Sequence, residues 1–153
     1  MNAMHTSATG DWYLECGEEE RVFNSVEALS EAIGACELNA RGRLVISRDA
    51  GPRPRWQRIF GLAPRYRVGF LSLDWSGDFA RLIFLDDNGS EYRAVDCRHP
   101  VVAPETIRAQ LGDGDVRSCP ADECMGTARA FRAVLYAVRK GQRTVWLGYR
   151  FVE

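Results

Sequence analysis

Residues 68–96 carry the clearest β-strand signal in the chain, and this segment constrains the fold most strongly. Its apolar runs are interrupted by Ser76-Gly77 and by Asp86-Asp87-Asn88-Gly89, where Asn-Gly tolerates the positive φ of a tight hairpin. Residues 91–96 then alternate with the period of two that is typical of a half-buried strand. The pattern predicts three antiparallel strands in a meander, over 68–75, 79–85 and 91–96.

The flanking sequence adds strands and helices to this meander. Asn24 and Glu27 form a capping-box pattern ahead of a helix, and Gly141 is placed to end the last helix in a left-handed conformation. Further strands are expected over 12–16, 43–47 and 144–151, and helices over 25–35, 103–111 and 121–140. The predicted fold class is α+β, with a central antiparallel sheet (meander plus C-terminal strand) packed against two or three helices.

The length of 153 residues suits one compact domain, so we expect a single α+β domain over 11–153 after a disordered segment, 1–10. The N-terminal sequence lacks the apolar core of a secretory signal. The apolar runs are also shorter than the roughly 20 residues of a membrane-spanning helix. We therefore expect a cytoplasmic protein with no membrane partner and with reduced cysteines.

Charge is balanced overall but uneven along the chain. The formal net charge is −1, which excludes a global field for nucleic acid or membrane. Segment 11–37 nevertheless has eight acidic residues against one Arg, and segment 48–67 has six Arg against one Asp. These segments predict two local patches of opposite charge.

Segment 49–67 contains three Pro and two Gly and is expected to be a long loop. Its Arg residues are interleaved with Trp56, Phe60 and Tyr66. Arginine with aromatic residues is typical of platforms for single-stranded nucleic acid and of protein–protein hot spots. An exposed insert with a few anchoring aromatics is the third interpretation.

No residue pattern predicts catalysis. Cys97 and His99 could share one side of an extended segment, but a thiol and an imidazole without an orienting group favour a structural interpretation. Cys119 and Cys124 lack the further ligands that a metal site needs. The sequence therefore predicts no enzyme activity, no catalytic residue, no metal and no cofactor.

The last third of the chain has a Pro-opened amphipathic helix, a Gly/Arg stop and a Trp-bearing final strand. These features lie in Pro120-Ala121-Asp122-Glu123, Ala128-Arg129-Ala130-Phe131 and Gly141-Gln142-Arg143-Thr144-Val145-Trp146. This pattern resembles the immunity proteins of bacterial polymorphic toxin systems, including contact-dependent and type VI secretion systems, and specifically immunity protein family one. The early helix and central meander agree with that family in order.

The resemblance implies a protein that binds a cognate toxin domain, often a nucleic-acid- or nucleotide-modifying effector, and occludes its active site. Trp146 would then be a structural anchor between sheet and helix. Candidate contact residues are the carboxylates Glu18, Glu19, Glu20, Asp74, Asp78, Asp86 and Asp87, the last four assigned to hairpin tips, and a second surface of Arg53, Arg55 and Trp56. The alternative function is a nucleic-acid-binding regulator that uses the Arg/aromatic loop, 48–67, although the balanced charge makes nucleic acid the less favoured partner.

Overall fold

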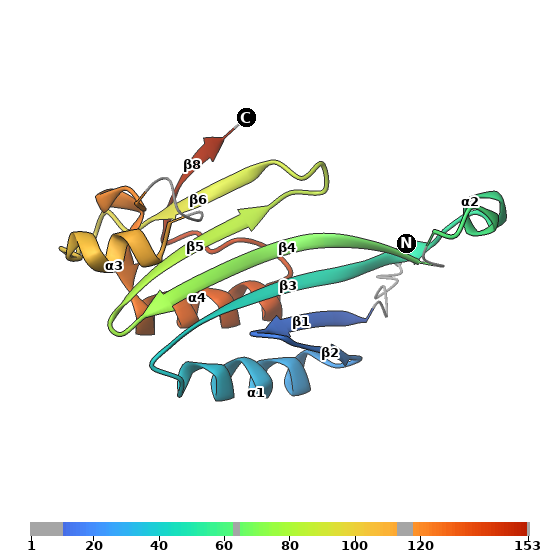
Figure 1. Cartoon of the computed structure of the whole chain (residues 1–153), viewed down its shortest axis with the longest axis horizontal. Helices are drawn as coiled ribbons and strands as arrows, with labels where there is room; N and C mark the ends of the chain where they lie inside the picture. The colour runs from blue at the N-terminus through green and yellow to red at the C-terminus, as the bar shows by residue number, and fades with distance from the viewer. Residues whose placement is uncertain (1–10, 63–64, 113–117, 153) are drawn as a thin grey trace, which may run out of the picture.

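A computed structural model describes residues 11–62, 65–112 and 118–152 (Figure 1). The predicted disorder of residues 1–10 lies outside this described part. Within it, an eight-stranded sheet has the order β2-β1-β3-β4-β5-β6-β8, and β7 pairs with β5. The strands are β1 (Trp12–Cys16), β2 (Glu19–Phe23), β3 (Arg41–Pro52), β4 (Arg65–Ser76), β5 (Phe79–Leu85), β6 (Glu91–Val95), β7 (Met125–Gly126) and β8 (Gly148–Val152).

The predicted α+β class and its meander are confirmed. Strands β4, β5 and β6 are consecutive antiparallel neighbours, and the C-terminal strand β8 pairs antiparallel with β6. Strand β2 was not predicted. It follows the turn at Gly17, whose φ is +66°, and forms the edge of the sheet beside β1.

Two helices, α1 (Val26–Glu37) and α4 (Thr127–Lys140), cover one face of the sheet and contact each other. In α1 the buried residues are Leu29, Ala32, Ile33 and Cys36, which repeat every three or four positions. This spacing places them on one helix face, toward the sheet. In the main core they pack with side chains from the sheet, including Leu14 of β1, Leu44 of β3 and Leu82 of β5.

A β-bulge in β4 adjusts which side chains enter this core. Ile46 of β3 pairs with Leu71, but the next residue, Ser47, pairs with Gly69, so Phe70 is the extra residue. A bulge changes the alternation of the strand that carries it. Consecutive residues Phe70 and Leu71 are consequently both buried in the main core.

The opposite side of β5 is covered in part by a smaller cluster. Phe79 packs there against Ala103, Leu111, Cys119 and Cys124. The short helix α3 (Glu105–Gln110) and the 3₁₀ turn η2 (Ala121–Glu123) belong to the same region of the chain. The helix predicted over 103–111 is therefore present, though shorter.

Segment 49–67 is not the loop that its composition suggested. Strand β3 continues to Pro52, β4 begins at Arg65, and the short helix α2 (Arg55–Ile59) lies between them. A second bulge between Asp49 and Gly51 bends the pair, and Gly51 has a φ of +110°. The two strands thus extend beyond the sheet as an arm that carries α2 at its end (Figure 1).

Three local predictions were also wrong. The N-cap of α1 is Ser25, whose Oγ accepts the Ala28 N–H at 3.1 Å, and not Asn24. The helix predicted over 121–140 is divided, because Cys124 is extended and β7 pairs with β5 before α4 starts. The terminal strand begins at Gly148, and Gly141 ends α4 with a φ of +71° as expected.

No helix in the described ranges is both long enough and apolar enough to cross a membrane.

Candidate protein-binding surfaces

The arm, residues 49–62 with 65–67, is held together by contacts between its two strands. The Asp49 carboxylate accepts the Gly51 N–H at 2.9 Å and pairs with the guanidinium of Arg65. The Gly51 hydrogen bond, together with Arg65, lowers the pKa of Asp49. Toward the tip, the hydroxyl of Tyr66 donates to Gln57 of α2 at 2.8 Å. The contacts of Asp49 thus join the two strands, and the hydrogen bond of Tyr66 joins β4 to α2.

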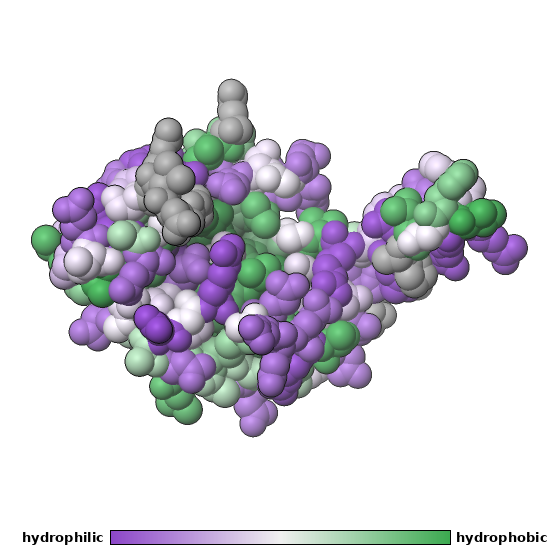
Figure 2. Space-filling model, in the orientation of Figure 1, coloured by the Kyte–Doolittle hydropathy of each residue, from purple (hydrophilic) through white to green (hydrophobic). Residues whose placement is uncertain are grey.

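The tip of the arm exposes a group of large apolar side chains. Trp56 is 60% exposed, Ile59 81% and Phe60 78%, and Leu62 follows at 48%. The first three lie at positions i, i+3 and i+4, so they share one face of α2. Figure 2 shows hydrophobic residues gathered on this projection among hydrophilic ones. Clustered exposed apolar residues of this kind are typical of interaction sites.

Most arginines of segment 48–67 already have partners. Arg48 lies over the ring of Phe70, Arg53 lies over Tyr66, Arg65 pairs with Asp49, and Arg67 makes a bidentate pair with Glu20. By contrast, Arg55 and Arg58 of α2 make no ion pair with any residue that the structure describes. The structure therefore places Arg55 and Trp56 together at the tip. Arg53 instead packs on the ring of Tyr66 within the arm.

The predicted acidic patch at Glu18–Glu20 is divided between two faces. Glu18 lies in the exposed turn between β1 and β2, and Glu19 opposes Cys16. Glu20 instead opposes Glu15 on the other face, where it binds Arg67 at 2.8 and 2.9 Å. That hydrogen bond lowers the pKa of Glu20. Glu20 thus helps to hold the base of the arm.

The four predicted hairpin-tip aspartates do not form one surface. Asp74 is not at a tip: it lies within β4, opposite Arg43 and Arg81, and its carboxylate is 3.7 Å from Arg43. Asp78 is exposed in the β4–β5 turn. Asp86 and Asp87 lie at the other end of β5, and Asp86 accepts the N–H groups of Asn88 and Ser90. Of these four aspartates, only Asp78 and Asp87 are exposed in turns, and they lie at opposite ends of β5.

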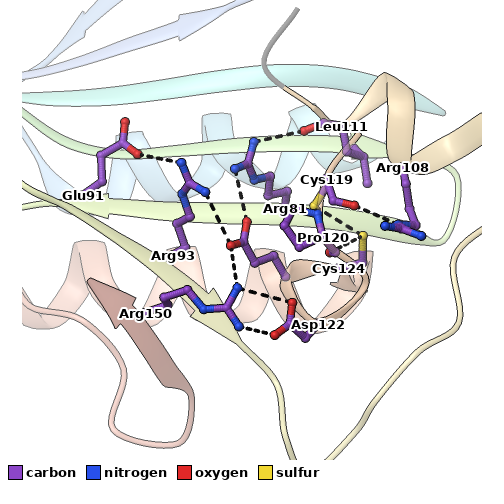
Figure 3. Close-up of polar contacts among 11 residues, drawn as sticks. Arg81, Glu91, Arg93, Arg108, Leu111, Cys119, Pro120, Asp122, Cys124 and Arg150 are labelled. Carbon is purple, nitrogen blue, oxygen red and sulfur yellow. Dashed lines mark hydrogen bonds and ion pairs between the residues drawn. The ribbon is translucent and has the colours of Figure 1, made fainter. Parts of the chain in front are cut away.

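A buried charge cluster around Glu123 was missed by the sequence analysis. Its carboxylate accepts a hydrogen bond from Arg81 at 3.2 Å, and Arg93 and Arg150 approach the other oxygen at 3.6 and 3.1 Å (Figure 3). Arg150 also binds Asp122, and this hydrogen bond lowers the pKa of Asp122. The cluster joins η2, β5, β6 and β8, so it stabilises the fold and offers no open site.

The residues considered for catalysis lie apart. Cys97 is exposed, and no hydrogen bond joins it to His99 within the described ranges. Nδ1 of His99 lies instead 3.7 Å from the buried carboxylate of Asp96. The described residues include no group of three or more His, Cys, Asp or Glu side chains placed to hold a metal ion.

Trp146 lies partly buried against the main core, outside any strand. The guanidinium of Arg129 is 4.7 Å from the centre of its ring, and Arg129 also pairs with Asp96. Trp146 therefore joins α4 to the segment that leads into β8, which is a structural position.

No protein-family model matches the chain, and no curated protein matches its sequence.

Proposed function

We propose that the chain is an immunity protein that binds a cognate bacterial toxin domain, one acting on nucleic acids or nucleotides, and neutralises it by covering its active site. The observation that carries this proposal is the exposed apolar face of α2, held away from the sheet on a two-stranded arm. A projecting element suits occlusion, because it can enter a cleft that a flat surface would only cover. The resemblance of the C-terminal segment to immunity proteins supports the same function.

The chemistry of the arm defines the surface that it would meet. Trp56, Ile59 and Phe60 require an apolar groove, since Trp and other aromatic residues contribute most when a pocket removes them from water. Arg55 and Arg58 lie beside this face and pair with no carboxylate among the residues that the structure describes. The groove should therefore be rimmed by Asp or Glu side chains, which give complementarity and faster association.

The arm is better suited to a protein than to single-stranded nucleic acid. A nucleic-acid platform combines accessible aromatic faces with a continuous line of free cations. Here the ring of Tyr66 is covered by Arg53, and Arg65 and Arg67 are neutralised by Asp49 and Glu20. The alternative function is a regulator that binds nucleic acid, and the binding measurements below distinguish it from toxin binding.

The direct test is co-expression with the product of the adjacent upstream gene, which the proposal expects to carry the toxin domain. The wild-type chain should restore growth and co-purify with the toxin. The triple variant Trp56→Ala, Ile59→Ala, Phe60→Ala should weaken binding by roughly 30-fold or more, the effect of losing about 2 kcal/mol at a hot spot.

The matched control is Leu38→Ala with Val102→Ala. These side chains are 87% and 93% exposed and lie away from the arm, so their truncation should leave affinity unchanged. Equal losses of toxin affinity in the triple variant and in the control would argue against the arm as the contact surface. Failure of the wild-type chain to bind or rescue would remove the function itself, and salt-sensitive binding of labelled single strands would support the alternative.

A further inference from the structure

Two thiols from distant parts of the sequence meet at the edge of the sheet. The Sγ atoms of Cys16 and Cys36 lie 3.0 Å apart, and both cysteines are free. Cys16 is the last residue of β1, and Cys36 lies in the last turn of α1. We propose that Cys16 and Cys36 are a modification site, at which a low-molecular-weight disulfide oxidises the two thiols to an intramolecular disulfide.

The fold brings these thiols together through two different periodicities. Along β1, Trp12, Leu14 and Cys16 alternate toward the face that the helices cover. Along α1, Cys36 continues the buried series Leu29, Ala32 and Ile33. Each thiol is thus placed by the packing of a whole element, so the pair is preorganised.

A cavity makes the pair reachable from outside. It has a volume of about 260 Å³, and its lining includes Cys16, Cys36, Glu19 and Arg21. Cys16 is partly exposed, whereas Cys36 is 8% exposed. Burial and the neighbouring Cys16 thiol raise the pKa of Cys36 to about 12. Cys16 is therefore the thiol that meets the reagent, and Cys36 is the one that resolves the intermediate.

The reaction needs only the external disulfide as oxidant. The Cys16 thiolate attacks one sulfur of RSSR, so that a mixed disulfide forms and RS⁻ leaves. The Cys36 thiol loses its proton to water, and its thiolate attacks the Cys16 sulfur and displaces the second RS⁻. The two thiolates released take up the two protons that the protein thiols lost. In sum, two protein thiols are oxidised and one RSSR is reduced to two RSH.

The disulfide would link β1, next to the edge of the sheet, covalently to α1. The cross-link spans 20 positions and encloses β2, whose strand partner in the described sheet is β1. Closing such a loop restricts the unfolded chain, and the melting temperature should rise by on the order of 5 °C or more. The acidic turn at Glu18 would become less mobile in the same event.

The chain contains its own internal controls. Cys119 and Cys124 also lie close, with their Sγ atoms 3.5 Å apart, but both are buried, at 0% and 3% exposure. Their contact raises the pKa of Cys119 and lowers that of Cys124. Because both thiols are buried away from an external reagent, this second pair should react after the first. Cys97 is exposed and can form only mixed disulfides, so Cys97→Ser is the suitable background.

The test treats the full Cys97→Ser chain with oxidised glutathione, followed by acid quenching, alkylation and trypsin. Cleavage after Arg21 and Arg41 places the two thiols in peptides 1–21 and 22–41, whereas Cys119 and Cys124 share one peptide, 118–129. We expect peptides 1–21 and 22–41 to become linked while 118–129 stays reduced. Cys36→Ser should stop at one glutathione adduct on Cys16.

Two results would overturn the proposal. One is separate alkylation of Cys16 and Cys36 at glutathione concentrations that fully modify Cys97 in the wild-type chain. The other is oxidation of Cys119 with Cys124 ahead of the first pair. Both readings come from chains that retain Cys16 and Cys36, so neither depends on whether a cysteine variant folds.

Discussion

Nη2 of Arg81 lies 3.2 Å from Oε2 of Glu123, and the two side chains are only 3% and 1% exposed. Oε1 of the same carboxylate faces Arg93 and Arg150. One buried carboxylate thus contacts guanidinium groups from three strands, and Arg93 and Arg150 also pair with Glu91 and Asp122. Removing one member of such a cluster leaves buried charge without compensation, which is far more destabilising than losing an exposed pair.

Glu123→Gln should therefore lower the free energy of unfolding by about 3–5 kcal/mol. The substitution retains the size of the side chain but removes the negative charge beside Arg81 and turns one acceptor oxygen into an NH2 donor. Urea denaturation measures the effect. The matched control is Asp122→Asn, at the adjacent exposed carboxylate that pairs with Arg150, and its effect should be far smaller because water screens that pair. Similar losses in the two variants would show that burial of Glu123 is not what matters.

Two glycines in helical contexts should respond oppositely to a methyl group. Gly141 ends α4 with a φ of +71°, and a Cβ there would meet only an Arg48 nitrogen at 3.8 Å. Gly141→Ala should thus destabilise through backbone strain alone, by about 1–2 kcal/mol. Gly34 lies inside α1 with open space around its Cα, so Gly34→Ala should stabilise by about 0.5–1 kcal/mol. Thermal unfolding of the two variants checks both signs.

The meander could be predicted because its determinants are local. Alternation and the Asn88-Gly89 turn act within a few residues, and the structure has β5 and β6 on either side of that turn. Segment 49–67 could not be predicted, because its Pro and Gly content resembles a loop. What extends β3 and β4 is pairing across the arm, such as Asp49 with Arg65.

In the candidate site, too, the sequence predicted local features but not those that depend on contacts between distant residues. Sequence identified Trp56 and Arg55 as residues able to bind a partner, and both lie at the tip of the arm. It also grouped Glu20 and Asp74 with the exposed carboxylates, although Glu20 binds Arg67 and Asp74 lies within β4, opposite an arginine of each neighbouring strand. Strand pairing decides which charged side chains form ion pairs within the fold, and composition does not reveal that pairing. The cluster at Glu123 was missed for that reason, since Arg81 is 42 positions away.

Trp146 and Trp56 should differ sharply in their contribution to stability. Trp146 packs against the main core beneath the guanidinium of Arg129, so Trp146→Ala should cost about 2–4 kcal/mol. Trp56 is 60% exposed, so Trp56→Ala should change the free energy of unfolding by less than about 0.5 kcal/mol. Guanidinium chloride denaturation compares the two. A large loss for Trp56→Ala would mean that its side chain supports the arm and is not available to a partner.

The backbone amides of the arm should lose protection from hydrogen exchange in acid. In the folded chain the Gly51 N–H and Arg65 lower the pKa of Asp49 below its ordinary value of about 4. A carboxyl group with a lowered folded pKa stabilises the fold above its ordinary pKa, and this contribution is lost as the pH falls through the lowered value. Hydrogen exchange, corrected for its intrinsic pH dependence, should therefore show the amides of Gly51 and Tyr66 opening more often near pH 3 than near pH 6, about a unit or more on either side of that ordinary value.

Asp49→Ala separates this effect from general acid unfolding. Its arm amides should exchange rapidly already at neutral pH and change little on acidification, while amides of α4 behave as in the wild-type chain. Glu20→Gln is the companion variant, because Arg67 lowers the pKa of Glu20 in the same direction. Glu20→Gln should keep the acid response at Gly51 but reduce protection near Arg67. An unchanged acid response of the arm in Asp49→Ala would show that other carboxyl groups hold it in place.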